Sequence, residues 1–403
     1  MIRPSGCTIR EMQTPYAEAK RNQMISIEHY ARRAAKTDNF PYGDIAPLLL
    51  GLFGEVGTLL SVLKKKKRDA DAFFGYREAL IEEIGDVLWY LNAVTRRSRI
   101  GLSVIFAHSV KSKLSATDLT FSTVQKHSSA PKGQIPSDEA LMTIASQAGR
   151  LIEDYQQKRF DKNRPALRAD LIEIAQGLIA AASSGGVDLN KAAETNLAKI
   201  ESWRPSKKNF PPLFDDRCDL HPDERLPRRM RVHFFEREVN GKVFAYQKYG
   251  GILIGDRLTD NHDPEDDYRF HDVFHMAYAA ILGWSPVIRA LLKTKRKSCP
   301  EVDENEDGAR AILLEEGLSA WIFERAKAHH FFENTKNLGL DILKEIKRFV
   351  AGYEPQHLPL WMWEKAILDG YAVFRLVRKN RGGIVIADLT RRSINYKQMG
   401  KNS

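Results

Sequence analysis

The feature that most constrains the fold of this chain is a regular apolar stripe in residues 80–94. Apolar side chains recur there at intervals of three and four residues, the period of one face of an α-helix. The preceding segment, residues 48–63, is apolar on most sides and carries a single carboxylate, that of Glu55, so we expect a buried helix. The polar residues 64–76 are expected to form the loop between these two helices.

The helical pattern resumes at Glu139 and continues to Trp203. Gly185-Gly186 is expected to end one helix, and Asp188 is expected to cap the next. The proline-bearing segment 204–212 is a candidate domain boundary. A chain of 403 residues with 43% apolar composition favours two or three modules over one core.

Residues 24–203 look like two related halves. The segment Gly54–Thr58 parallels Ser146–Arg150, and Glu83–Asp86 parallels Glu173–Gln176. We interpret this as a degenerate internal repeat, in which two helical hairpins pack as a bundle. The predicted organisation is repeat 1 in residues 1–114, a linker in 115–138, repeat 2 in 139–205 and a third region in 214–403.

The third region begins with short β-like runs between Met230 and Ile254. Asn240-Gly241 within it is a strong hairpin signal. From Tyr268 the pattern is helical, and residues 384–386 are expected to form one last strand. The predicted fold class is mainly α: a tandem helical bundle followed by a mostly helical α+β C-terminal domain.

Composition restricts the setting and the partners. The three cysteines are far apart, and no stretch approaches about 18 consecutive apolar residues, so we expect a cytoplasmic protein without a membrane span. The net charge of +10 suits anionic partners, but the basic residues are mostly dispersed over a solvated surface. A nucleic acid is not expected as a partner, because no run of interleaved aromatic and basic residues occurs.

Carboxylates mark the candidate site. Glu83 and Asp86 lie three residues apart and therefore point from one side of a helix, and Glu82 precedes Asp86 by four. Glu55 in apolar surroundings needs a partner, because an unpaired buried carboxylate costs several kcal/mol. A shared Mg²⁺, or alternatively Mn²⁺, would supply that partner. The competing interpretation is a solvated helix face.

The basic run from Lys64 to Arg68 lies just past the first helix. We expect Lys64 to add positive charge for substrate phosphates. The alternative is a favourable charge at the C-terminus of a helix.

The segments Leu52–Gly57 and Glu82–Leu91 resemble the MazG family of all-α nucleoside-triphosphate pyrophosphohydrolases. The family's mark is E-x-x-E on one helix and E-x-x-D on the next. The resemblance covers roughly residues 24–203. It implies a homo-oligomer, such as a dimer, and hydrolysis of a nucleoside triphosphate to the monophosphate and pyrophosphate.

The resemblance also implies residue roles. Glu55, Glu83 and Asp86 would bind Mg²⁺, Glu82 would orient the attacking water, and Glu83 would also count as catalytic. Asn196 and Lys199, on the last helix, would face the substrate phosphates.

The chain departs from the family pattern at several ligand positions. Thr58 stands where the second carboxylate of E-x-x-E is expected. Repeat 2 has Gln147, Arg150 and Gln176 at the ligand positions and keeps only Glu173. We therefore expect one composite site, with metal ligands from repeat 1 and phosphate-facing residues from repeat 2, which would act as a built-in dimer partner.

A second cluster lies in the third region. His271 and His275 are four residues apart on a predicted helix, a spacing that can chelate a metal, and Asp272 lies between them. Glu315 and Glu316 could add oxygen ligands. We favour the alternative in which these side chains pair within a helical core. The region also looks like the accessory C-terminal part of some MazG-type proteins.

Two functions remain open at this stage. The first is a pyrophosphohydrolase that serves nucleotide house-cleaning or depletes nucleotides in phage defence. The second is a nucleotide sensor, left without turnover by the change at Thr58, that signals through residues 214–403. Measured turnover separates the two.

Overall fold

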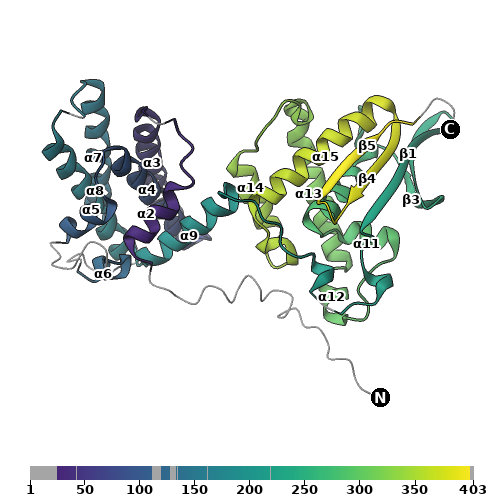
Figure 1. Ribbon diagram of the computed structural model, residues 1–403, viewed down its shortest axis with the longest axis horizontal. Helices are drawn as coiled ribbons and strands as arrows, with labels where there is room; N and C mark the ends of the chain where they lie inside the picture. Colours follow the sequence, from purple (N-terminus) through teal and green to yellow (C-terminus); the bar gives the residue numbers. More distant parts are fainter. Residues whose placement is uncertain are drawn as a thin grey trace, which may run out of the picture. The chain divides into compact units, whose positions relative to one another are not determined.

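The computed structural model describes residues 25–399 except 42, 111–118, 128–132, 134, 161 and 218. Residues 22–208 and residues 209–403 form separate compact units, here called the N-terminal and C-terminal units. The division falls inside the proline-bearing segment 204–212. The first is helical and the second combines helices with one sheet, so the predicted mainly α class is confirmed (Figure 1).

The N-terminal unit is built from helices. They are α2 (Ile27–Ala35), α3 (Ala46–Asp69), η1 (Ala70–Ala72), α4 (Tyr76–Arg97), α5 (Leu102–Ser109), α6 (Phe121–Lys126), α7 (Asp138–Gln156), α8 (Arg164–Ser184) and α9 (Leu189–Trp203). The apolar stripe predicted for residues 80–94 lies on α4, and its members are buried. The side chain of Asp188 accepts a hydrogen bond from the backbone N–H of Asn190 and so caps α9, as predicted.

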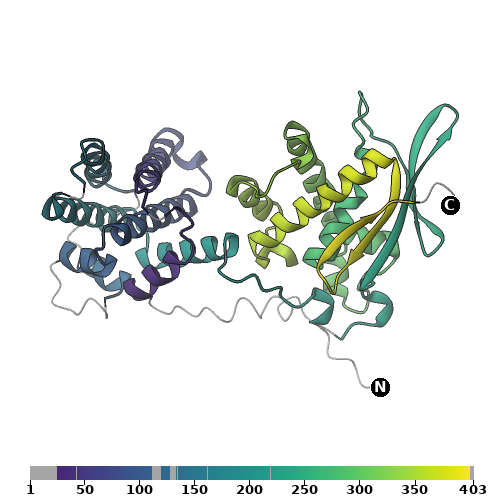
Figure 2. The same ribbon diagram turned by 45° about the horizontal axis from the view of Figure 1, so that its top comes forward.

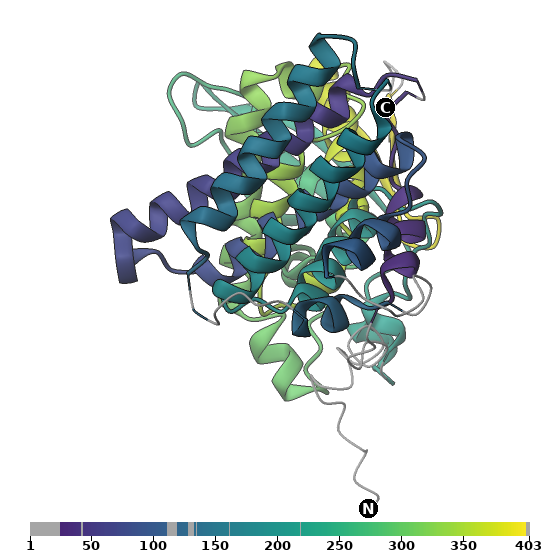
Figure 3. The same cartoon turned by 90° about the vertical axis from the view of Figure 1, so that its left-hand side faces the viewer.

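The helices pack as two hairpins, α3–α4 and α7–α8, each of which also contacts a helix that follows the other hairpin. Helix α3 packs on α4, α7 packs on α8, and α3 packs on α7. Figure 3, in which this unit faces the viewer, shows the long helices lying lengthwise along one another. Helix α9 then packs on α4, whereas α5 packs on α8. Each hairpin therefore receives the last helix of the other, as two repeats would arrange them, and the repeat itself stays a prediction.

Two sequence expectations for this unit are wrong. Residues 64–69, expected in a loop, continue α3 to Asp69, because lysine and arginine are good helix formers. Residues 115–138, expected as a linker, contain α6, whose Phe121 and Val124 are buried. Together with Leu119, which is also buried, these side chains attach the segment to the core.

Residues 46–72 are long and apolar enough to cross a membrane by length and composition alone. However, Leu48, Leu52, Val56 and Leu59 on this segment are buried in the core of the unit. Burial among the neighbouring helices accounts for these residues, whereas Leu50 and Phe53 on the same helix are exposed.

The C-terminal unit contains one five-stranded antiparallel sheet of order β3-β2-β1-β4-β5. Its strands are β1 (Arg229–Val239), β2 (Lys242–Tyr249), β3 (Ile252–Leu258), β4 (Gly382–Asp388) and β5 (Ser393–Lys397). Asn240 and Gly241 both have positive φ and form the predicted turn between β1 and β2. The expected strand 384–386 lies within β4, and β5 was not predicted.

Helices cover one face of this sheet, as Figure 2 shows for α15. The helices of the unit are η2 (Phe214–Asp216), η3 (Pro222–Glu224), η4 (Tyr268–Phe270), α10 (Asp272–Ala277), the π-helix η5 (Tyr278–Leu282), α11 (Pro286–Leu292), α12 (Pro300–Asn305), α13 (Ala309–Ala328), η6 (His330–Phe332), α14 (Leu340–Phe349), η7 (Glu354–His357) and α15 (Leu360–Asn380). On β1, Met230, Val232 and Phe234 point into the core beneath the helices. Cys299 is a buried free thiol, whereas Cys7 and Cys218 lie outside the described residues.

Candidate functional site

Three carboxylates from α3 and α4 converge in the N-terminal unit. Glu55 comes from α3, and Glu83 and Asp86 come from successive turns of α4. One oxygen of each lies within 4.8 Å of the other two. The antiparallel packing of α3 on α4 thus brings together the three residues that the sequence singled out as ligands.

The electrostatics of this group favour a cation. Burial, followed by the negative charges of Asp86 and Glu83, raises the pKa of Glu55 to about 7. The hydroxyl of Thr58 donates to the backbone oxygen of Glu55 at 2.8 Å and lies 3.3 Å from its Oε2. Carboxylate oxygens in this arrangement are the ligands that Mg²⁺ prefers. The residue set therefore fits a hard divalent ion.

Helix α9 supplies the other half of the cluster. The Asn196 side chain donates through Nδ2 to Asp86 Oδ1 at 2.9 Å. Lys199 Nζ donates to both oxygens of Asp86 and to Glu82 Oε1, the latter at 3.0 Å. Burial lowers the pKa of Lys199, but the negative charges of Asp86 and Glu82 raise it above its ordinary value. The structure thus places all four of these residues in one cluster.

A glycine allows α9 to come this close. A Cβ on Gly85 would lie 2.9 Å from the backbone oxygen of Ala192 and 2.9 Å from Asn196 Cβ. Both distances are too short for a real contact, so any larger residue would push α9 away from α4. Gly85 lies directly before Asp86, and its missing side chain positions Asn196 on that carboxylate.

Sequence reasoning missed Tyr30 on α2. Its hydroxyl donates to Asn196 Oδ1 at 2.9 Å, and the side chain is fully buried. This bond orients the amide so that its NH₂ group faces Asp86. Burial, with a contribution from the charge of Asp86, raises the pKa of Tyr30 well above its usual range, which keeps the hydroxyl a donor.

Sequence reasoning also missed an aromatic cluster beside the carboxylates. The ring centroids of Trp89 and Tyr90 lie 4.8 Å apart, and those of Phe40 lie 6.4 and 6.5 Å from them. Tyr90 follows Asp86 by one helical turn and packs against Gly51, where a Cβ would collide with its ring. The aromatic residues of α4 were recognisable, but Phe40 belongs to a loop that periodicity does not describe.

Lys64 does not lie at the carboxylate cluster, and its role in binding phosphate stays a prediction. It lies nine residues after Glu55 on the same helix, about 13.5 Å farther along the axis. There it lines a separate groove beside Asp138 and Leu141 of α7. The helix continues where a flexible loop was expected, so the lysine cannot fold back.

The matching positions of the second hairpin are paired internally. Gln147 donates to Glu173, and Gln176 donates to the backbone oxygen of Ser109 at 3.1 Å. Arg150 lies 3.5 Å from Asp170. These contacts join the side chains to one another, although Gln147 Oε1 and Asp170 Oδ2 are buried without a hydrogen-bond partner. The second hairpin therefore carries amides and an arginine where the first carries the candidate metal ligands.

Comparisons with known proteins identify the family. Residues 209–400 match the family model of the MazG C-terminal domain. Human dCTP pyrophosphatase 1 is 32% identical over 118 residues, which make up 28% of this chain and 69% of that protein. The chain belongs to the MazG-like family. No solved structure matches it.

A second cluster of the MazG-like chain lies in its C-terminal unit. His271 and His275, at the start and middle of α10, face Glu316 of α13, and one donor atom from each lies within 4.8 Å of the other two. Among the described residues, this group and the Glu55 group are the two His/Cys/Asp/Glu sets of this kind. Asp272 lies 3.5 Å from His271 Nε2, and Glu315 lies 2.9 Å from His275 Nδ1.

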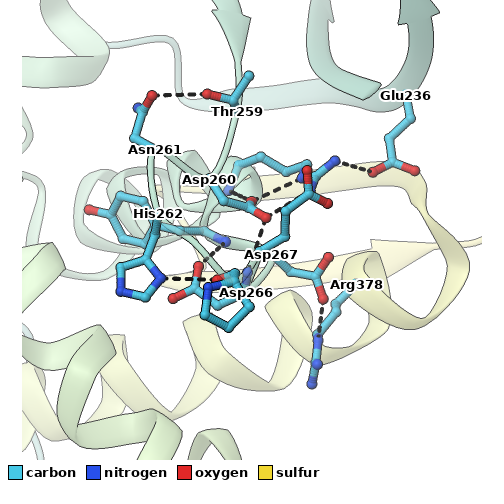
Figure 4. Close-up of polar contacts among 12 residues, drawn as sticks. Glu236, Thr259, Asp260, Asn261, His262, Asp266, Asp267 and Arg378 are labelled. Carbon is cyan, nitrogen blue, oxygen red and sulfur yellow. Dashed lines mark hydrogen bonds and ion pairs between the residues drawn. The ribbon is translucent and has the colours of Figure 1, made fainter. Parts of the chain in front are cut away.

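The loop that precedes α10 is fixed by charged contacts. Asp260 accepts from the backbone N–H, Nε and Nη2 of Arg269, at 2.7 to 2.9 Å, and both side chains are buried. Figure 4 shows Asp260 within this network and Arg378 of α15 on Asp267, a contact of 2.6 Å. Lys327 of α13 similarly holds Asp266 at 2.8 Å. The start of α10 is therefore anchored to both α13 and α15.

The open face of the sheet carries a surface that the sequence did not predict. The rings of Phe235 and Tyr246 stack across β1 and β2 with centroids 5.7 Å apart. Arg237 and Lys248 lie over the Phe235 ring at 5.0 and 5.4 Å. Basic and aromatic residues thus alternate between strands, where a search along the chain does not find them.

Proposed function

We propose that the N-terminal unit hydrolyses a nucleoside triphosphate to the monophosphate and pyrophosphate. The observation that carries this proposal is the convergence of three carboxylates of α3 and α4, one of which, Asp86, contacts Asn196 and Lys199 of α9. Membership of the MazG-like family and the similarity to human dCTP pyrophosphatase 1 support it.

In this proposal Glu55, Glu83 and Asp86 hold Mg²⁺, or alternatively Mn²⁺. The bound ion supplies positive charge to the phosphate oxygens and activates water. Lys199 shifts from Asp86 to the triphosphate when the carboxylates are neutralised, because its ammonium then finds more negative charge on the substrate. Glu82, released from Lys199, accepts a hydrogen bond from the attacking water and orients it. Water adds at phosphorus, and the bond to the leaving pyrophosphate breaks.

The aromatic cluster Phe40, Trp89 and Tyr90 is the part of the proposed site that suits a base. Tyr90 lies one turn from Asp86, so a nucleotide with its phosphates at the carboxylates has aromatic rings within reach of its base. Stacking on such rings contributes about 1–3 kcal/mol per base and tolerates several bases.

The test is pyrophosphate release by the purified full chain from a panel of NTPs and dNTPs with Mg²⁺. We expect turnover to fall at least about 100-fold in Glu83→Gln, because a metal ligand contributes several kcal/mol to the transition state. Lys199→Met should lose turnover similarly. Glu173→Gln, the matched change in the second hairpin, should keep it. No release from any nucleotide, or full activity in Glu83→Gln, would refute the proposal.

The alternative function is a nucleotide sensor. The observation that favours it is Thr58, which offers a hydroxyl to Glu55 where the family pattern has a carboxylate. The same assay separates the two functions, since a sensor binds Mg²⁺-nucleotide without releasing pyrophosphate. House-cleaning and nucleotide depletion in phage defence are both compatible with the proposed reaction, and the substrate preference in the panel distinguishes them.

A further inference from the structure

The C-terminal unit contains a histidine-carboxylate cluster that the proposed hydrolysis does not use. The Glu316 Oε2 atom lies 3.6 Å from His271 Nε2 and 3.3 Å from His275 Nε2. A metal ion bound at 2.0–2.1 Å by such donors in tetrahedral geometry separates them by about 3.3 Å. The two distances to Glu316 are therefore close to the edge of a coordination tetrahedron, and the two histidine donors lie within 4.8 Å of each other.

In each histidine, a hydrogen bond at Nδ1 orients the ring so that Nε2 faces the cluster. His275 Nδ1 lies 2.9 Å from Glu315 Oε1, and His271 Nδ1 lies 2.9 Å from the backbone oxygen of Tyr268. Both partners are acceptors, so both Nδ1 atoms carry a hydrogen and both Nε2 atoms face Glu316. Metal-binding histidines are oriented by the same kind of outer bond.

Glu315 is itself held in place by further bonds. Its carboxylate accepts from the Ser285 hydroxyl at 2.7 Å and from the backbone N–H of Val287 at 2.9 Å. Its side chain is fully buried, as is that of His275. Glu315 therefore serves to orient His275 and is not directed at the cluster.

An unsatisfied atom points into the cluster. His275 Nε2 is buried and makes no hydrogen bond of acceptable geometry. Buried polar atoms without a partner are rare, because each costs about 1–3 kcal/mol. A positive charge is therefore needed between these donors, which lie 3.3 to 3.6 Å apart, and it can be a metal ion or the proton that Glu315 and Glu316 favour on His275.

Solvent reaches the cluster from the side of Glu316, whose side chain is 37% exposed, whereas that of His271 is 11% exposed. Asp272 Oδ1 lies 3.5 Å from His271 Nε2 and 4.0 Å from His275 Nε2. Its other oxygen accepts from Gln247 of β2. Three ligands with an accessible fourth side are typical of metal sites that also bind water or a small ligand.

We propose that the C-terminal unit binds one divalent transition-metal ion, Zn²⁺ or Fe²⁺, through Nε2 of His271, Nε2 of His275 and the carboxylate of Glu316. Two imidazoles and one carboxylate are a donor set common to both ions. Mg²⁺ is disfavoured, because it prefers oxygen ligands. The site is separate from the Glu55 cluster, which offers only oxygen. The sequence interpretation that favoured pairing within a helical core is the competing explanation.

The experiment is metal analysis of the full chain by mass spectrometry. The protein is stripped with chelator, dialysed against Zn²⁺, or against Fe²⁺ without oxygen, and then washed with excess Mg²⁺. We expect about one equivalent of Zn²⁺ or Fe²⁺ per chain to remain. The ion that is retained more completely is the preferred one. His271→Asn and Glu316→Gln should lose that equivalent. Glu315→Gln should weaken binding about 10–100-fold, as expected for loss of an orienting partner.

Three control variants separate this site from other histidines and carboxylates. His262→Asn changes an exposed histidine of the preceding loop, Glu324→Gln changes an exposed carboxylate of α13, and Glu83→Gln changes the oxygen-only cluster. All three should retain the ion. Circular dichroism verifies that each variant is folded.

If a ligand variant fails to fold, X-ray absorption of the metal-loaded natural protein replaces it, and we expect scattering from two imidazoles. The proposal is overturned if the natural protein retains no transition metal, which would leave a protonated imidazole as the cation of the cluster. It is also overturned if folded His271→Asn and Glu316→Gln retain as much metal as the controls, or if absorption shows no imidazole ligand.

Discussion

Removal of a proposed metal ligand, Glu55, is predicted to stabilise the metal-free protein. Burial and then the charges of Asp86 and Glu83 raise the pKa of this carboxyl from 4.5 to about 7. The folded protein thus binds the proton more tightly than the unfolded chain does. Ionised Glu55 therefore destabilises the fold by an amount that grows above pH 4.5 and is complete above about pH 7. The interval corresponds to about 3 kcal/mol, which solvent screening of this partly exposed group reduces to about 1–2 kcal/mol.

The assay is thermal unfolding of Glu55→Gln and the natural protein at pH 8 in EDTA. The variant keeps the shape of the side chain and removes its charge, so its Tm should be roughly 2–8 °C higher. At pH 4 the carboxyl is protonated in both states, and the difference should disappear. Added Mg²⁺ should raise the Tm of the natural protein and have little effect on the variant.

The matched control is Glu173→Gln on α8, where the carboxylate accepts from Gln147 and its removal should bring no gain. A variant less stable than the natural protein at pH 8 in EDTA would refute the reasoning. Equal stabilisation of both proteins by Mg²⁺ would refute the assignment of Glu55 as a ligand.

Three further predictions follow from other parts of the structure. The apparent Mg²⁺ affinity, measured by calorimetry, should fall about tenfold from pH 8 to pH 6, because a proton then occupies Glu55; a flat profile would contradict this. Gly85→Ala should lose turnover and about 1–3 kcal/mol in urea unfolding, because its Cβ collides with α9, whereas Gly57→Ala, with open space, should be neutral or stabilising. Arg296→Met removes the shared partner of the buried carboxylates of Glu354 and Asp307, although Asp307 keeps Arg289 at 3.6 Å, and should cost about 3 kcal/mol in unfolding of the C-terminal unit; a loss below about 1 kcal/mol would show that they are not charged.

The helices and the three-carboxylate set could be predicted from the sequence for a definite physical reason. An amphipathic helix buries one face, so its apolar residues recur with the helical period along the sequence. The apolar stripe on α4 therefore indicated which side of the helix carries Glu83 and Asp86. Glu55 stood out because a lone carboxylate in an apolar segment requires a partner. Asn196 was singled out through the family resemblance, and the comparison of the two halves suggested a site shared between them; its hydrogen bond to Asp86 was not predicted.

Other features depend on contacts between distant segments and leave no local signal. Tyr30 reads as an ordinary core residue until α2 and α9 are seen to meet. The position of Lys64 depends on whether α3 ends before it or continues past it. Helix propensity over only a few residues decides between these two outcomes. The orientation of His275 depends on Glu315, 40 residues farther along the chain.

The packing of α9 on α4 also determines whether two inactive variants can complement each other. The carboxylates and the lysine that faces them come from one polypeptide, so two defective chains cannot repair each other. Mixing Glu83→Gln with Lys199→Met should restore no turnover, and the specific activity of the natural protein should not fall on dilution. A site shared between two separate chains would behave in the opposite way on both counts.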